Sequence, residues 1–166
     1  MKKFLQFSGL IAAALALAAF IFLMAGSALV YRNNNSAYYV PGTIAIFGGD
    51  LKMSILTLEC SLAAPALIAW IFVLLSMLAL IVVSVLPLLK VKALDKFAGL
   101  ISLCAAGLLL VGGILLFFTK VAFTGANSNV FDDYHLAFPF VFAAILAIAA
   151  AGVAACPTVM GLLGKK

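Results

Sequence analysis

Charged side chains are scarce in this chain and absent from most of its length. Of its 166 residues, 9% are charged and 67% are hydrophobic. Four stretches contain no Asp, Glu, Lys, Arg or His: residues 4–30, 61–89, 97–119 and 136–164. A helix needs about 20 apolar residues to cross the hydrocarbon layer of a bilayer, and each stretch is long enough. A soluble domain has about 25% charged residues, so the composition predicts a chain whose apolar surface is covered by lipid.

The missing charges also argue against several classes of membrane function. Pumps and ion-coupled transporters keep ionisable side chains within their spans, and the four stretches have none. Ser76, Ser84 and Ser102 lie inside these stretches without a base that could activate a hydroxyl as a nucleophile. We therefore expect neither an ion-coupled transporter nor an intramembrane enzyme. A pore lined by backbone groups or hydroxyls stays open as an alternative.

Motifs that hold metals or cofactors are missing as well. The three cysteines, Cys60, Cys104 and Cys156, form no Cys-x-x-Cys or Cys/His spacing, which argues against zinc and redox sites. We interpret them as small buried hydrophobic side chains. The segment 48–50 reads Gly-Gly-Asp and lacks the Gly-Lys-Ser/Thr ending of a phosphate-binding loop. No cofactor is predicted.

What is present predicts a single membrane domain over residues 1–166. The expected fold is an all-α integral membrane protein, a four-transmembrane-helix antiparallel bundle with helices at about 4–30, 61–89, 97–119 and 136–163. The connection 90–96 is so short that the second and third helices must be antiparallel neighbours. The first outer loop, about 30 residues over 31–60, is longer than the second. Its short apolar runs suit either a small hairpin or an interfacial helix.

Lysine placement predicts the orientation. Seven cations lie at the termini and in the second connection, against three in the first and third connections. The seven are Lys2, Lys3, Lys90, Lys92, Lys96, Lys165 and Lys166; the three are Arg32, Lys52 and Lys120. Because positive loops stay inside, both termini are expected in the cytoplasm, in a plasma membrane or a bacterial inner membrane. The net charge of +5 is thus a topology signal, and no nucleic-acid partner is expected.

The first stretch has a second interpretation. Two lysines followed by an apolar run resemble a secretory signal, and residues 25–28 are small enough for cleavage. A signal has an apolar region of about 7–15 residues, shorter than the run 4–30. We expect a retained helix. Cleavage, which would leave three spans and an external N-terminus, is the alternative.

Small residues recur along each predicted helix at helical spacing. Hydrophobic side chains gain little by leaving lipid for one another, so helices in membranes associate through close contacts at small residues. The predicted packing positions are Ala143, Ala147, Ala151 and Ala155; Gly99, Ala106 and Gly113; and Ala12, Ala19 and Gly26. The fourth helix has more alanine than one contact face needs. It is therefore the candidate for contact with another membrane protein or with a second copy of the chain.

One polar cluster precedes the fourth helix. Asp132, Asp133 and His135 could bind a divalent metal ion, because carboxylates and imidazole are common metal ligands. The simpler interpretation is that Asp133 caps the helix, whose N-terminal end favours acidic groups, and that His135 meets lipid headgroups. No metal site is predicted, and this cluster is kept as the weak candidate.

The order of segments resembles the layout of claudin-like tetraspan proteins: four helices, a longer first outer loop, a short cytoplasmic turn and a smaller second outer loop. The tryptophan and paired cysteines that mark the first loop of claudins are missing, because residues 31–59 contain neither residue type. The likeness therefore extends to the layout, and no family is assigned.

The sequence thus predicts a small multi-pass membrane protein, and three hypotheses for its function stay open. The first hypothesis is that the protein is a non-enzymatic accessory or scaffold subunit. It would be embedded in the lipid bilayer and act through its helix faces and outer loops. The second hypothesis is a transport component or channel for a neutral or hydrophobic solute. The third is a metal or enzyme site on the outer surface, formed by Asp132, Asp133 and His135.

Overall fold

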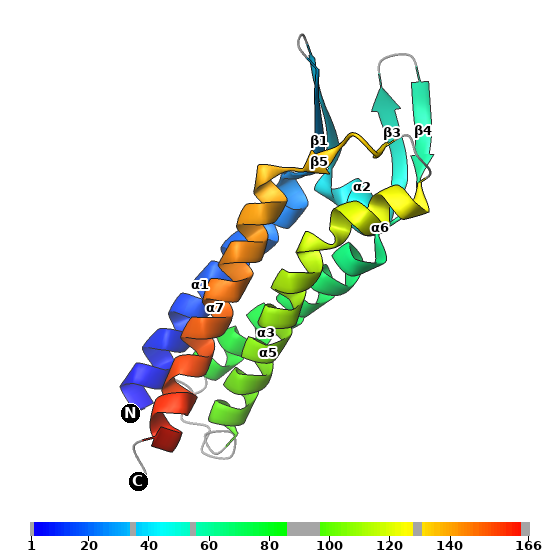
Figure 1. Cartoon of the computed structure of the whole chain (residues 1–166). Coiled ribbons are helices and arrows are strands. Elements are labelled where there is room, and N and C mark those ends of the chain that lie inside the picture. The colour runs from blue at the N-terminus through cyan, green and yellow to red at the C-terminus, as the bar shows by residue number, and fades with distance from the viewer. Residues whose placement is uncertain (1, 34–35, 54–55, 86–96, 128–130, 164–166) are drawn as a thin grey trace.

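The chain is mostly helical, with strands gathered at one end (Figure 1). The computed structural model describes residues 2–33, 36–53, 56–85, 97–127 and 131–163. Four of its helices are long and apolar enough to cross a membrane. They are α1 (Lys2–Ala25), α3 (Ala64–Val85), α5 (Ala98–Phe117) and α7 (Phe138–Leu163).

The four long helices pack in a closed order. Helix α1 lies against α3 and α7, and α5 lies against the same two helices. The start of α1 and the end of α7 lie at the same end, opposite the strands (Figure 1). Small side chains such as Ala16, Ala69 and Ala147 are fully buried along the inner faces. Leu80 and Leu109 fill the remaining space between the helices.

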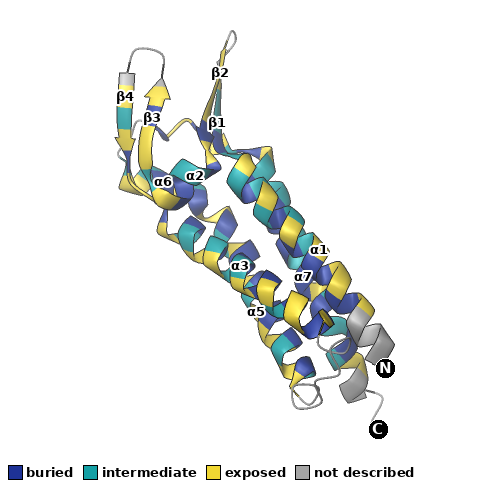
Figure 2. Ribbon diagram, turned by 180° about the vertical axis from the view of Figure 1, so that it is seen from behind, coloured by how far each residue is buried: buried dark blue, intermediate teal, exposed yellow. Residues whose placement is uncertain are grey.

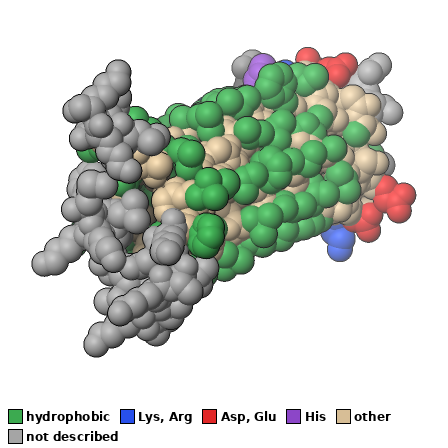
Figure 3. Space-filling model, turned by 90° about the horizontal axis from the view of Figure 1, so that it is seen from below, with side chains coloured by type: hydrophobic (Ala, Val, Ile, Leu, Met, Phe, Trp, Pro, Cys, Tyr) green, Lys and Arg blue, Asp and Glu red, His purple; other side chains and the backbone are tan. Residues whose placement is uncertain are grey.

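Where their side chains are described, the faces of these helices that point away from the bundle are mainly apolar. Figure 2 shows buried residues on the sides where helices meet and exposed residues facing away. The exposed positions include many large hydrophobic side chains, among them Leu75, Leu100, Val111 and Ile145. Among the described residues, the charged side chains visible in Figure 3 lie at the end that carries the strands, and hydrophobic side chains cover the face along the helices. An apolar surface of this extent marks a region that contacts lipid or protein.

The expectation of an all-α fold is wrong, because two small sheets accompany the helices. In the first, β1 (Ser27–Asn33) pairs antiparallel with β2 (Ser36–Pro41) and with the two-residue strand β5 (His135–Leu136). In the second, β3 (Gly49–Met53) pairs with β4 (Leu56–Cys60). The short helix α2 (Gly42–Phe47) lies between the two hairpins. The segment between α1 and α3 therefore contains two hairpins and a short helix.

The predicted helix bounds were too wide at the helix ends nearest the strands. Helix α1 ends at Ala25, not at residue 30, because residues 27–33 leave the helix to form β1. Helix α7 starts at Phe138, since the two residues before Ala137 pair with β1. Helix α5 ends at Phe117, and a turn leads into α6 (Thr119–Ala126). The inner end of α3 is described to Val85, and the predicted continuation to residue 89 lies outside the described residues.

An aromatic cluster ties the two outer segments together. Phe123 of α6 packs edge-on against Phe131, with ring centroids 5.1 Å apart, and Phe131 makes a similar contact with Tyr134. Tyr134 lies 5.5 Å from Tyr31 of β1, which stacks on Tyr38 of β2. Phe123 and Phe131 are almost fully buried. Aromatic pairs of this kind add about 0.5–1.5 kcal/mol beyond the area they bury.

Candidate docking groove between α5 and α7

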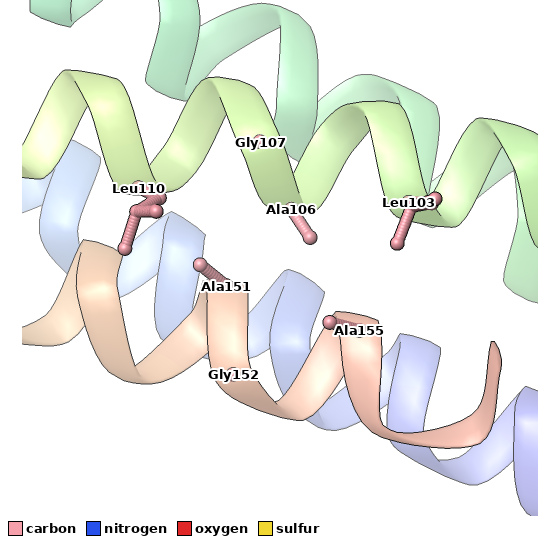
Figure 4. Close-up of a pocket in the computed structure, with 7 residues that line it drawn as sticks. All are labelled: Leu103, Ala106, Gly107, Leu110, Ala151, Gly152 and Ala155. Atoms are coloured by element: carbon pink, nitrogen blue, oxygen red, sulfur yellow. The ribbon is translucent and has the colours of Figure 1, made fainter. Parts of the chain in front are cut away.

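A groove of about 370 Å³ runs along the outer surface between α5 and α7 (Figure 4). Its lining residues are Leu103, Ala106, Gly107 and Leu110 of α5 and Ala151, Gly152 and Ala155 of α7. The side chains of Ala106 and Ala151 point across it toward the opposite helix (Figure 4). No polar or titratable side chain is among these seven residues, so the groove can receive an apolar group but offers no acid, base or metal ligand.

Helical spacing gives the groove its shape. On α5, Leu103, Ala106, Gly107 and Leu110 follow the i, i+3, i+4, i+7 pattern that places residues on one face of a helix. Leu103 is 42% exposed and Leu110 is 45% exposed, and these two side chains bound the small residues between them. The seven-residue repeat covers two turns, or about 10 Å of helix.

Two glycines that line the groove have open space where a side chain would begin, as far as the structure describes the chain. A Cβ atom added at Gly107 or Gly152 would meet nothing within 4 Å. Other glycines of the long helices are in contact: a Cβ at Gly113 would lie 2.7 Å from Ile148 Cγ1, and one at Gly9 would lie 2.7 Å from Ser84 Oγ. Glycine costs a helix about 1 kcal/mol relative to alanine. The open glycines therefore carry a cost that no contact within the described part of the chain offsets.

The groove has fixed walls because α5 and α7 are joined beside it. Ser102 Oγ of α5 donates a 2.8 Å hydrogen bond to the carbonyl oxygen of Ala154. Nearer the inner end, Thr158 Oγ1 donates a longer, 3.4 Å bond to the carbonyl oxygen of Gly99. On the outer side, the tight approach at Gly113 brings the helices together. A site that is already formed needs little rearrangement to accept a partner.

The groove's role has to be argued from its own residues. No protein-family model, curated protein or solved structure matches this chain. The apolar lining and the open glycines both suit contact with another apolar surface.

The predicted packing residues fall into two groups. Ala106, Ala151 and Ala155 line the groove. The others lie at helix contacts within the chain: Ala12, Ala19, Ala143 and Ala147 are fully buried, and Gly26, Gly99 and Gly113 have neighbours in contact range. Gly107, Leu103 and Leu110 were not singled out from the sequence. The i, i+3, i+4, i+7 spacing of a glycine between leucines is the signal that could have found them.

The structure does not assemble the polar cluster into a site. Asp132, Asp133 and His135 are all exposed. Within the described residues, no group of three His, Cys, Asp or Glu side chains comes close enough to hold a metal ion. Asp133 lies five residues before α7, so it does not stand at the first turn of that helix. His135 belongs to β5 and pairs with Val30.

The cysteines differ in their surroundings. All three are free thiols. Cys60 is buried at the end of β4, where burial and the nearby Asp50 carboxylate raise the pKa of its thiol. Cys156 is half-buried, as a small hydrophobic side chain would be. Cys104 is exposed on α5, which corrects the expectation that it is buried.

Proposed function

We propose that this protein is a non-enzymatic accessory or scaffold subunit that binds a transmembrane helix of another membrane protein in the groove between α5 and α7. The observation that carries this proposal is the pair of glycines, Gly107 and Gly152, that stand open on facing helices. In membranes, glycine lets a second helix approach the backbone closely. The partner helix would present small residues or a narrow apolar ridge.

The proposal places the four long helices across a bilayer as an antiparallel bundle. Their length and apolar outer faces support this placement. The outer strands would lie on one side of the membrane, and the ends of α1 and α7 on the other. The lysine count favours the cytoplasm for both termini, in a plasma membrane or a bacterial inner membrane.

A helix of a different protein fits the groove better than a second copy of the same surface. A symmetric dimer brings the same patch of both subunits together, so that patch must complement itself. Two hollow grooves placed face to face would leave a void between them. A convex helix fills a hollow lined by Ala106, Gly107 and Gly152 without that loss.

The test is photocrosslinking of the full chain in its native membrane. A photoreactive amino acid at Leu110, on the groove, is compared with one at Leu78, an exposed position on α3. We expect a protein adduct of one defined mass from Leu110 and only lipid adducts from Leu78. Gly152→Leu should abolish the protein adduct, because the new side chain occupies the space meant for the partner.

Ala149→Leu is the matched control. Ala149 is exposed on the same helix but does not line the groove. This variant should leave the adduct at Leu110 intact. If Leu110 gives lipid adducts alone, or if its protein adduct survives Gly152→Leu, the groove is not a docking surface.

Transport of a neutral or hydrophobic solute is the second candidate, and the wholly apolar lining favours it. Reconstituted vesicles would then show flux of such a solute that Gly152→Leu reduces and Ala149→Leu does not. Flux without any protein adduct from Leu110 would support transport over docking.

A further inference from the structure

A second hollow, of about 420 Å³, lies between the β1–β2 hairpin and the first turn of α7. Arg32 of β1 and Tyr39 of β2 line it from the sheet, together with Val30. Phe138 and Pro139 line it from the first turn of α7. The residues thus come from a strand pair above and a spanning helix below (Figure 1).

Strand pairing explains why Arg32 and Tyr39 meet in this hollow. Val30 pairs directly with Tyr39, so both side chains lie on one face of the sheet. Arg32 is two residues beyond Val30 and therefore shares that face. Tyr31 and Tyr38 point to the opposite face, where their rings stack and Tyr31 contacts Tyr134. The sheet accordingly has one face packed with aromatic rings and one that presents a cation.

The hollow changes from apolar to cationic along its length. Phe138 is 70% exposed at the outer end of its span, and Pro139 lies beside it. Tyr39, with its ring 51% exposed, and Arg32 lie on the hairpin beyond that end. In the part of the chain that the structure describes, the Arg32 guanidinium has neither an acidic partner nor a hydrogen bond. An exposed, unpaired guanidinium beside aromatic rings offers a fork of donors for an anion.

We propose that this hollow binds a phospholipid of the outer leaflet through its phosphate group. Arginine pairs with phosphate through two parallel hydrogen bonds, and the Tyr39 hydroxyl can donate a third. The glycerol backbone and the first part of an acyl chain would lie against Phe138 and Pro139. A phospholipid has the same order of groups as the hollow, with an anion above hydrocarbon. The inference depends on the membrane placement proposed above, but not on the groove between α5 and α7.

The test is lipid binding by the purified full chain in a neutral detergent. Native mass spectrometry is used to titrate phosphatidylglycerol, and we expect one molecule to bind more tightly than the rest. Arg32→Gln should weaken that binding about tenfold or more, because hydrogen bonds to charged groups contribute about 1.5–3 kcal/mol. Arg32→Lys keeps the charge but loses the paired donors of the guanidinium. Its affinity for phosphatidylglycerol should lie between those of wild type and Arg32→Gln.

Lys52→Gln is the matched control, since Lys52 is another exposed cation of the outer strands and is not part of the hollow. It should leave the affinity unchanged. Phe138→Ser tests the apolar end, and its high exposure means that folding should survive the change. It should weaken phosphatidylglycerol binding as well, with only a small drop in melting temperature from the lost ring contact with Phe142.

Two further ligands test whether the hollow recognises the whole phospholipid or only one of its parts. Diacylglycerol, which lacks the phosphate, and inorganic phosphate, which lacks the chains, should each bind at least tenfold more weakly than phosphatidylglycerol. Equal affinity of wild type and Arg32→Gln would overturn the proposal, as would displacement of the lipid by inorganic phosphate at equal concentration. Arg32→Gln should not change crosslinking from Leu110, so failure here is distinct from failure of the docking proposal.

Discussion

The hydroxyl of Ser102 on α5 donates a 2.8 Å hydrogen bond to the carbonyl oxygen of Ala154 on α7. Ser102 is almost completely buried, so water does not compete for this bond. The hydrogen bond joins α5 to α7 beside the groove that lies between these two helices. A hydroxyl in this setting therefore has a structural role, since it links two helices.

Removing that hydroxyl should loosen the contact between α5 and α7. Hydrogen bonds between helices in membranes contribute about 0.6 kcal/mol on average and up to about 1.7 kcal/mol. We expect Ser102→Ala to lower the free energy of unfolding by about 1 kcal/mol, measured by denaturant titration in mixed micelles.

Ser76→Ala is the control for Ser102→Ala. Ser76 is fully buried on α3, but its hydroxyl has no hydrogen-bond partner among the described residues. Replacing an unsatisfied polar group by a methyl group should be neutral or stabilising. Equal losses in the two variants would mean that the bond to Ala154 is not what Ser102 contributes.

Replacing Gly113 or Gly107 of α5 by alanine should change the stability of the protein in opposite directions. At Gly113 the new methyl group would lie 2.7 Å from Ile148 Cγ1 and 3.0 Å from the Ala144 carbonyl oxygen. Overpacking of this kind costs about 1–3 kcal/mol. At Gly107 the same methyl group meets nothing within 4 Å, so Gly107→Ala should be neutral or stabilise the helix by up to about 1 kcal/mol.

Thermal unfolding of both glycine variants in the same detergent provides the comparison. Gly113→Ala should melt at a lower temperature than wild type, and Gly107→Ala at the same or a higher one. A destabilised Gly107→Ala would show that the groove is already occupied by part of the chain, contrary to its open geometry.

The sequence predicts the four long helices well, because helices of this kind need only a continuous apolar stretch of sufficient length. Their outer ends are predicted poorly for the same reason. Residues 27–30 read Ser-Ala-Leu-Val and continue the apolar run, yet they form β1. Apolarity alone cannot separate a buried strand from a helix. What decides the structure is pairing with β2 and with His135–Leu136 of β5, more than a hundred residues away.

The groove shows a similar limit. Small residues on α5 and α7 mark helix contacts in the sequence, but the sequence does not say which contacts face inward. Ala147 is fully buried between helices, whereas Ala155, two turns further along, is half-buried and lines the groove together with Ala151, which is 5% exposed. The crossing of α5 and α7 determines this difference, and that crossing depends on long-range contacts such as the one at Gly113.

Asn127 should be essential for holding α6 against the outer end of α3. Its Nδ2 donates to the carbonyl oxygens of Ser61 and Phe123, at 3.0 Å and 2.9 Å, and its Oδ1 accepts a short hydrogen bond from the Ser61 backbone N–H. Asn127→Ala would leave the two Ser61 backbone groups without this partner. We expect faster amide hydrogen exchange in α6 and at Ser61, with a loss of about 1–2 kcal/mol in local stability.

Thr124→Ala provides the comparison for Asn127→Ala. The Thr124 hydroxyl bonds to the carbonyl oxygens of Lys120 and Val121, which belong to its own helix. Its removal should leave exchange at Ser61 unchanged. Unaltered exchange at Ser61 in Asn127→Ala would show that the bridge does not join the two segments.

Tyr134 should make the end of the molecule that carries the strands sensitive to alkaline pH. Burial, followed by the neighbouring Tyr38, Tyr31 and Cys60, raises the pKa of its hydroxyl above the ordinary value for tyrosine, near 10. The folded protein therefore holds the proton more tightly than the unfolded chain. This contribution to stability is fully present below the ordinary pKa and is lost as the pH rises through the raised one.

Replacing Tyr134 by phenylalanine tests that contribution, because the variant keeps the ring contacts with Phe131 and Tyr31 but cannot ionise. Melting temperatures measured from neutral pH to above about pH 10 should fall less steeply for Tyr134→Phe than for wild type. The slope should decrease rather than vanish, since the Cys60 thiol also has a raised pKa. Tyr39→Phe, at an exposed ring outside the cluster, should keep the wild-type slope. Identical slopes for Tyr134→Phe and Tyr39→Phe would mean that the hydroxyl of Tyr134 is not held in its neutral form by the fold.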